Sequence, residues 1–272
     1  IIQRDRNQPE FKLTMARYQK RVVTKRNIAV GRKKAKRYAK LLNSVSQKYG
    51  VQPRFILAIW AIETRYGAIE ANVPLIPSLA TLAFDARRST FFRKQLFAAL
   101  QMVNRGHIDL NSLFGSWAGA MGQTQFMPSS FLSHATDYNG DNRIDIWNTR
   151  ADALASGANY LKKAGWNPDL TWGREVRLPE GFDTTLASKT NRLTLAQWHA
   201  LGVMRVDGSA LPLRDGIKGR IVLPESKKKG GPEGKTGRAF LVYDNFDVIL
   251  DWNRSNFFAI AVGQLADQIK TQ

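Results

Sequence analysis

The chain has 272 residues, of which 43% are hydrophobic, and no cysteine. These values are typical of a globular protein with one large domain or two, and the lack of cysteine excludes disulfides and thiolate metal sites.

The formal net charge is +19. Residues 1–40 hold 14 Lys or Arg residues against two acidic ones, a net charge of +12. Such a segment attracts polyanions, namely nucleic acid, an anionic membrane surface or an anionic wall polymer; the alternative is a well-solvated helix face.

No apolar run approaches the ~20 residues that a membrane-spanning helix requires. The histidines, His107, His134 and His199, show no metal-ligand spacing, which argues against a zinc site. Because the chain opens at Ile1 rather than Met, we expect that a leading segment has been removed.

The segment 53–67 is the central feature of the sequence. Residues 55–62 are all apolar, and a helix that is apolar on every side is buried. Pro53 suits its first turn, and Gly67 suits the position just past its end. Glu63 is then a lone carboxylate in the last turn, where desolvation and the helix dipole both raise its pKa. This pattern predicts a general acid; the alternative is a structural ion pair with Arg65 or another cation.

The other helices are predicted from periodicity and capping residues. Residues 1–10 are expected to form an extended arm, and residues 11–46 a helix interrupted near Gly31. Ser78 is a candidate N-cap for the next helix. Residues 151–164 form a helix that Gly165 ends.

The segment 115–130 combines glycines with neutral polar and aromatic side chains. Ser116, Gln123 and Gln125 offer hydrogen-bonding groups, and Trp117 and Phe126 offer flat apolar faces. Such groups suit a sugar better than a phosphate, and no P-loop pattern is present. Tight packing between helices would explain the glycines equally well.

The segment 137–148 resembles the start of an EF-hand calcium loop. Asp137, Asn139, Asp141 and the carbonyl of Arg143 stand at alternate positions, as oxygen ligands do in that loop. The match then weakens, since position six is Asn142 and position twelve is Asn148. Asp152 could supply the missing carboxylate; the alternative is an acidic turn held by its own hydrogen bonds.

From residue 167 the composition shifts toward strands. Segments 175–179, 220–224 and 239–243 have strand-like patterns. A short helix is expected at 195–201, and the loop 226–237 reads as a flexible surface connection.

Several motifs in the same order resemble the lytic murein transglycosylases of the membrane-bound lytic transglycosylase B type. The motifs are Gln8-Pro-Glu-Phe11, Tyr49-Gly-Val51, Trp60-Ala-Ile-Glu-Thr-Arg-Tyr-Gly67, Leu79-Ala-Thr-Leu-Ala-Phe84 with Arg87-Arg88, Gly119-Ala-Met-Gly122, Gln125-Phe-Met-Pro-Ser-Ser130, the loop 137–147 and Asn253-Arg-Ser255.

The resemblance implies a mainly α (α+β) fold with a lysozyme-like helical catalytic core. The expected division is a basic N-terminal helical region, 1–48, completed by the C-terminal helix 251–272. The catalytic core spans 49–166 and carries the EF-hand-like loop, and a small β-containing insertion spans 167–250.

The resemblance also implies the site. Glu63 is the single catalytic carboxylate, and the metal site comprises Asp137, Asn139, Asp141, Arg143 and Asp152. The glycan groove is lined by Ser116, Gln125, Phe126, Met127, Tyr160, Arg87, Arg88, Asn245 and Asn253.

The expected reaction follows from a missing second carboxylate, because ordinary glycosidases use two. Asp85 and Glu70 are the nearest candidates, and both read as surface or capping residues. Glu63 is then expected to protonate the glycosidic oxygen and take a proton from the 6-hydroxyl of the sugar. The β-1,4 MurNAc–GlcNAc bond of peptidoglycan would be cleaved without water, leaving 1,6-anhydro-MurNAc ends.

No cofactor is expected for catalysis, and calcium is expected only in a structural role. The expected partners are peptidoglycan glycan strands and other cell-wall enzymes, and no nucleic acid is expected. The protein is expected to be a monomer. It is expected to act in the bacterial periplasm or cell envelope. Two alternatives stay open, a goose-type-lysozyme-like hydrolase and a basic nucleic-acid-binding protein. A catalytically inactive wall-binding module is disfavoured because Glu63 and its helix are intact.

Overall fold

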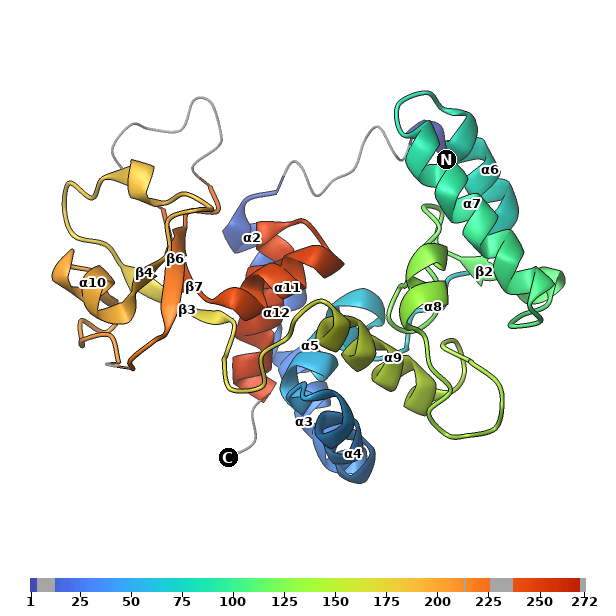
Figure 1. Ribbon diagram of the computed structural model, residues 1–272, viewed down its shortest axis with the longest axis horizontal. Helices are drawn as coiled ribbons and strands as arrows, with labels where there is room; N and C mark the ends of the chain where they lie inside the picture. Colours follow the sequence, from blue (N-terminus) through green and yellow to red (C-terminus); the bar gives the residue numbers. More distant parts are fainter. Residues whose placement is uncertain (4–12, 213, 226–236, 270–272) are drawn as a thin grey trace.

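The computed structural model describes residues 1–3, 13–212, 214–225 and 237–269. Three hydrophobic cores follow one another along the long axis of the molecule (Figure 1). A small β-sheet domain lies at one end, a helical body in the middle, and an arm of paired helices at the other end. The fold is mainly helical, as the sequence predicts.

The middle body is organised around the predicted buried helix. This helix, α5, spans Pro53–Thr64, and every residue from Phe55 to Ala61 is buried. Burying a large apolar side chain of this kind contributes roughly 1.5–3 kcal/mol. The helix α12 (Asn256–Ile269) packs along α5, and both helices belong to the first core, which is the core of the middle body. The end of the chain therefore completes the core that holds Glu63.

Three N-terminal helices surround this pair: α2 (Met15–Val22), α3 (Lys25–Arg37) and α4 (Ala39–Tyr49). The predicted interruption near Gly31 is wrong, because α3 runs through it and the chain bends at Thr24 and Tyr38 instead. A Cβ at Gly31 would lie 2.5 Å from Tyr66 Oη and 2.7 Å from Ile269. The glycine therefore permits close helix packing. The predicted arm, residues 1–10, falls mostly outside the described residues.

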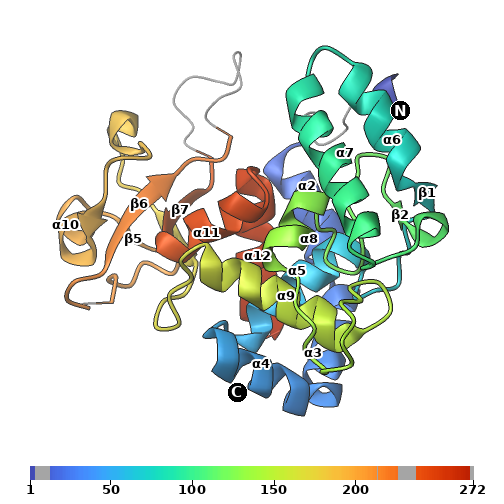
Figure 2. The same ribbon diagram turned by 45° about the vertical axis from the view of Figure 1, so that its right-hand side comes forward.

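The second core lies under the arm of helices α6 (Leu75–Phe84) and α7 (Ser89–Asn104), which Figures 1 and 2 show side by side. A two-stranded ribbon pairs β1 (Val73–Pro74) with β2 (Phe114–Gly115) at its base, after the short 3₁₀ helix η2 (Leu110–Ser112). The helix α8 (Pro128–His134) closes this core. Ser78 is not an N-cap, since α6 begins three residues earlier and buries it.

The helix α9 (Arg150–Lys163) joins the two cores. Its Ala153 belongs to the second core, and its Leu154, Ala158 and Leu161 belong to the first. The predicted helix and its end at Gly165, where φ is 95°, are confirmed.

The third core belongs to a five-stranded antiparallel sheet with strand order β4-β6-β7-β3-β5. The strands are β3 (Gly173–Arg177), β4 (Leu193–Thr194), β5 (Met204–Arg205), β6 (Lys218–Val222) and β7 (Ala239–Val242). A 3₁₀ helix, η3 (Thr184–Leu186), and a helix, α10 (Leu195–Ala200), flank them. The three predicted strands and the short helix are confirmed within two residues; the predicted flexible loop falls on 226–236, outside the described residues.

The cores divide the chain differently from the predicted ranges. The predicted boundary at residue 48 separates α4 from α5, yet both contribute to the first core. The predicted boundary at 250 falls inside α11 (Asp244–Trp252), whose Phe246, Val248 and Ile249 also belong to that core. Among the described helices, none combines the length and apolar character that a membrane crossing requires.

Candidate active site

Glu63 is the penultimate residue of α5 and is half-buried. The helix ends earlier than predicted, because Arg65, Tyr66 and Gly67 all have positive φ, at 50°, 63° and 78°. Left-handed backbone costs about 1–2 kcal/mol at each of the two non-glycine residues. The turn is stabilised by Tyr66, which is buried and donates from Oη to the carbonyl of Asn27 at 2.7 Å. The chain therefore turns sharply directly after Glu63.

Thr64 holds this turn against the segment 115–130, whose side chains the sequence suggests for sugar binding. Its Oγ1 donates to the carbonyl of Gln123 at 2.6 Å and accepts the N–H of Gly67 at 3.0 Å. Arg65, the alternative ionic partner of Glu63, is exposed and forms no ion pair with any described residue. The interpretation of Glu63 as half of a pair with Arg65 is therefore wrong.

Trp252 is a site residue that the sequence reasoning missed. It is the last residue of α11, and its indole Nε1 donates to Oε1 of Glu63 at 2.9 Å. Its ring packs against Phe126 and Tyr160, with centroid distances of 5.3 and 4.9 Å. The only signal in the sequence is its place immediately before Asn253-Arg-Ser255, one of the motifs that carry the family resemblance.

Tyr160, a predicted groove residue, completes this aromatic wall from α9. Its hydroxyl donates to the carbonyl of Asp251 at 2.8 Å. Burial, and next the charge of Asp251, raise the pKa of Tyr160, so its hydroxyl stays protonated at neutral pH. Tyr160 and Trp252 pack against both the first and the second core. Glu63 therefore lies at the junction of the two cores, beside three aromatic rings.

The glycine-rich segment packs closely, as the alternative interpretation of its glycines predicts. A Cβ at Gly119 would lie 2.5 Å from Leu79, and one at Gly122 would lie 2.7 Å from Ile146, so close packing requires these glycines. Phe126 is 2% exposed and supports the aromatic wall more than it offers a face. Met127 is half-buried and precedes α8.

The predicted polar groove residues of this segment also stabilise the loop. The Ser116 hydroxyl accepts the N–H groups of Ala118 and Ala120, at 3.3 and 3.0 Å. Gln125 has a positive φ of 53°, and its side chain donates to the carbonyl of Gly122 at 3.1 Å. Both side chains are partly exposed.

The two predicted asparagines differ. Asn245 is 0% exposed, and its side chain bonds to the backbone of Asn167 twice and to the carbonyl of Leu170. The expectation that it lines the groove is wrong, because every polar atom of its side chain holds the 167–170 loop. Asn253 is partly exposed beside Trp252, and its Oδ1 accepts the N–H of Ser255 at 3.1 Å.

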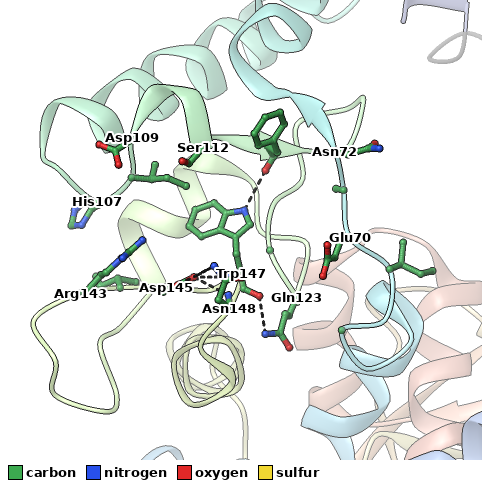
Figure 3. Close-up of a pocket in the computed structure, with 17 residues that line it drawn as sticks. Glu70, Asn72, His107, Asp109, Ser112, Gln123, Arg143, Asp145, Trp147 and Asn148 are labelled. Atoms are coloured by element: carbon green, nitrogen blue, oxygen red, sulfur yellow. Dashed lines mark hydrogen bonds between the residues drawn. The ribbon is translucent and has the colours of Figure 1, made fainter.

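Arg87 and Arg88 lie in the turn between α6 and α7, at the outer end of the arm in both views (Figures 1 and 2). The guanidinium of Arg88 stacks over Phe91 and Phe92, at 4.9 Å from each ring. Burial and the charge of Arg87 lower its pKa. Asp85 lies in this turn as well, and Glu70 lines a different pocket (Figure 3).

The EF-hand-like loop has part of the expected form. Asp137 accepts the N–H groups of Gly140 and Asn142, at 2.7 and 2.8 Å, and Asp141 accepts that of Arg143 at 2.9 Å. Asn142 stands where the calcium loop has glycine, and its φ of 67° supplies the same sharp turn. The mismatch at position six is therefore conformationally harmless.

The predicted metal ligands are not gathered into a preformed cluster. Within the described part of the chain, no three His, Cys, Asp or Glu side chains could together hold a metal ion. Asp152 is 0% exposed, and its two oxygens accept the N–H groups of Tyr138 and Asp145, at 2.8 and 2.9 Å. It closes the loop through hydrogen bonds to both ends. The all-oxygen donor set of the other positions fits calcium chemically.

Ion pairs connect the β-sheet domain to the helix that ends at Trp252. Arg220, which is 6% exposed, donates to Asp247 Oδ1 at 2.7 Å, and Arg192 pairs with Asp244 and Asp247. Breaking a buried pair costs about 3–5 kcal/mol. The first turn of α11 is thereby fixed to the sheet, while its last residue contacts Glu63.

Known proteins with similar sequences indicate the family of this chain. A family model described as Transglycosylase SLT domain matches residues 1–267. The chain belongs to this family. Membrane-bound lytic murein transglycosylase B of Escherichia coli is 32% identical over 266 residues, which are 93% of this chain and 66% of that protein. The chain thus spans slightly less than two thirds of that relative's length.

Solved structures of this transglycosylase family share the fold. SltB3 of Pseudomonas aeruginosa with NAG-NAM-pentapeptide superposes with a TM-score of 0.89 and 41% identity, over 99% of this chain and 70% of SltB3. SltB3 with NAG-anhNAM-pentapeptide gives 0.85 and 40%, over 94% and 67%. Escherichia coli Slt35 with calcium gives 0.75 and 32%, over 94% and 78%. The lysozyme-like fold predicted from the sequence is therefore confirmed.

Proposed function

We propose that this protein is a lytic transglycosylase that cleaves the β-1,4 MurNAc–GlcNAc bond of peptidoglycan without water. The observation that carries the proposal is the single carboxylate, Glu63, held by the Trp252 indole against an aromatic wall. The anhydro sugar named in one SltB3 complex supports the same reaction for this chain. Analysis of the released sugar ends tests the proposal and is designed in the Discussion.

The proposed reaction moves one proton in each direction through Glu63. The protonated carboxyl donates to the glycosidic oxygen as the bond from the anomeric carbon to that oxygen breaks, and GlcNAc leaves with a 4-hydroxyl group. The carboxylate then removes the proton from the MurNAc 6-hydroxyl, whose oxygen attacks the anomeric carbon and closes the 1,6-anhydro ring. The acetamido oxygen of the sugar can stabilise the positive charge between these steps.

The surrounding side chains support the two proposed roles of Glu63, first as an acid and then as a base. Trp252 donates its indole N–H to Oε1 of Glu63 and so orients the carboxyl group. The Tyr160 hydroxyl is committed to Asp251, so it holds the wall and does not compete for Glu63. A fixed donor and fixed rings keep the carboxyl in a reactive position, and orientation of this kind is a main source of catalysis. The raised pKa predicted for Glu63 stays a prediction.

We propose further that the 137–148 loop binds a structural calcium ion through Asp137, Asn139, Asp141 and the carbonyl of Arg143, with Asp152 holding the loop closed.

Calcium at about 100 times its Kd is expected to stabilise the folded state by about 2.7 kcal/mol. Asp141→Ala is expected to abolish the resulting rise in Tm, because it removes a ligand oxygen. Thermal melts with calcium and with chelator measure this. Asp215→Asn, at an exposed carboxylate in the sheet domain, is the control, and identical parent melts would contradict the proposal.

The basic face of α3 and α4 is proposed to adsorb the enzyme to the anionic wall. Lys33, Lys36 and Lys40 are exposed, whereas Lys34 stacks on Tyr38 and Trp60, at 5.5 and 5.3 Å from their rings. Reversing the three exposed lysines to Glu is expected to weaken binding to purified sacculi at low salt. Added salt should weaken parent binding too, because exposed charges are screened beyond ~8 Å at physiological salt.

A pull-down of sacculi across a salt series measures this adsorption. The matched control reverses Arg177, Lys189 and Lys218, three exposed cations of the sheet domain. Equal binding of sacculi by the parent and the α3–α4 variant at low salt would show that these lysines form only a solvated helix face and do not bind the wall. Steep, salt-sensitive DNA binding without wall cleavage would instead favour the nucleic-acid alternative.

The remaining expectations concern location and partners. We propose that the protein acts in the bacterial cell envelope, in the periplasm, because its substrate lies there. That the protein is a monomer stays a prediction. Association with other cell-wall enzymes stays a prediction.

A further inference from the structure

A pocket of about 430 Å³ lies where segments far apart in sequence meet (Figure 3). Its walls come from residues 67–72 after α5, from 107–114 between α7 and β2, and from 143–148. Gly122 and Gln123 lie between these walls. The volume falls in the range of roughly 300–1,000 Å³ that is typical of small-ligand sites. Glu63 does not line this pocket, which is therefore separate from the catalytic carboxylate.

Three charged side chains around this pocket form no hydrogen bond or ion pair with any described residue. Glu70 and Asp109 are exposed, and neither carboxylate forms a hydrogen bond or ion pair with any described residue. The Arg143 guanidinium is also exposed and free of such contacts in the described chain. The chain has 41 basic and 22 acidic residues, so two carboxylates without a cation are unexpected. These groups are available to a ligand that carries both signs of charge.

A fixed aromatic side chain lies between these charges. In Figure 3, Trp147 separates His107, Asp109 and Arg143 from Glu70 and Asn72. Its indole Nε1 donates to the carbonyl of Phe114 at 3.2 Å, and its backbone carbonyl accepts from Gln123 Nε2 at 2.9 Å. Because its polar atom is used, the ring offers an apolar surface in a fixed orientation. A preformed surface lowers the entropy lost on binding.

The pocket is linked to the catalytic helix through Gln123. The backbone carbonyl of Gln123 accepts from Thr64, the residue after Glu63, at 2.6 Å. The Gln123 side chain is 9% exposed, and its Oε1 is buried without a hydrogen-bond partner among the described residues. A ligand in this pocket would therefore lie one residue contact away from the active site.

We propose that this pocket binds the peptide stem of the peptidoglycan substrate. The proposal rests on the proposed function and names a further part of the substrate. A stem peptide carries free ammonium and carboxylate groups: the ammonium would pair with either Glu70 or Asp109, which lie on opposite sides of Trp147 in Figure 3, and a carboxylate with Arg143. Its methyl and methylene groups would pack on Trp147. A neutral glycan would leave three charges unused, and a polyanion would be repelled by the two carboxylates.

The test compares cleavage of peptide-bearing glycan strands with cleavage of the same strands after an amidase has removed the peptides. The ratio of kcat/KM for peptide-bearing to bare strands is expected to fall about tenfold in the double variant Glu70→Gln/Asp109→Asn, because it removes both carboxylates with which the ammonium could form a charge-assisted contact. Neither carboxylate forms a hydrogen bond or ion pair with a described residue, so the variant should fold. The control Glu180→Gln/Asp215→Asn removes two exposed carboxylates of the sheet domain and should keep the parent ratio.

A direct measurement of peptide binding tests the pocket whether or not the protein cleaves glycan strands. Calorimetric titration with free stem pentapeptide is expected to show binding by the parent and at least about fivefold weaker binding by the double variant and by Arg143→Gln. An unchanged cleavage ratio in the double variant, or no binding of the peptide by the parent, would overturn the peptide pocket. If the parent binds the peptide but cleaves neither substrate, the pocket stands and the proposed function fails.

Discussion

Glu63→Gln is expected to lower the rate of peptidoglycan cleavage by about 10²–10⁴-fold, the usual contribution of a general acid or base. The amide has the size of the carboxyl group, and its oxygen can still accept the indole N–H of Trp252. It can neither donate a carboxyl proton to the glycosidic oxygen nor remove one from the 6-hydroxyl. The loss should therefore appear in kcat, with the Tm and the binding of sacculi close to those of the parent.

Release of soluble muropeptides from purified sacculi measures this rate. Glu180→Gln, the same chemical change at an exposed position of the sheet domain, is the control and should keep the parent rate. Most of the activity remaining in Glu63→Gln would show that another group moves the proton.

Trp252→Phe is expected to lower kcat by about 10- to 100-fold, because small displacements of a catalytic group have effects of that size. Phenylalanine preserves most of the packing against Phe126 and Tyr160 but has no N–H for Oε1 of Glu63. The carboxyl group would then be free to rotate between productive and unproductive positions. KM should change much less, since the glycan contacts remain.

The matched control for this variant is Trp166→Phe. Trp166 also uses its indole N–H, which donates to Gln52 at 2.9 Å, but it lies in the first core and does not contact Glu63. Both variants should lose comparable stability in a thermal melt, and only Trp252→Phe should lose kcat. Equal kcat values for the two variants would mean that Trp252 only packs.

Local patterns in the sequence predict correctly that α5 is a buried helix with Glu63 in its last turn. The apolar run after Pro53 has no polar face, so burial of α5 does not depend on how the rest of the chain folds. The same holds for α9 with Gly165 and for the strands of the sheet, where periodicity and turn residues suffice. The family resemblance adds the role of Glu63, which local patterns alone leave open.

The residues that the sequence does not reveal depend on tertiary packing. Trp252 lies 189 residues after Glu63, and no local pattern brings the end of α11 to the end of α5. Asn245 is polar and next to a motif, but only the folded structure shows that all its hydrogen bonds are used internally. The predicted division into domains stays a prediction, and local patterns could not decide it, because α5 is apolar on every side and packs against neighbours from both ends of the chain.

Mass spectrometry of the glycan ends released from purified sacculi in heavy-oxygen water tests the central claim most directly. A hydrolase would add one water across the bond and leave a reducing MurNAc end that carries the heavy oxygen. The proposed reaction instead closes the ring with the sugar's own 6-hydroxyl. We expect 1,6-anhydro-MurNAc ends that are lighter by one water and free of label, and labelled reducing ends as the main product would contradict the account.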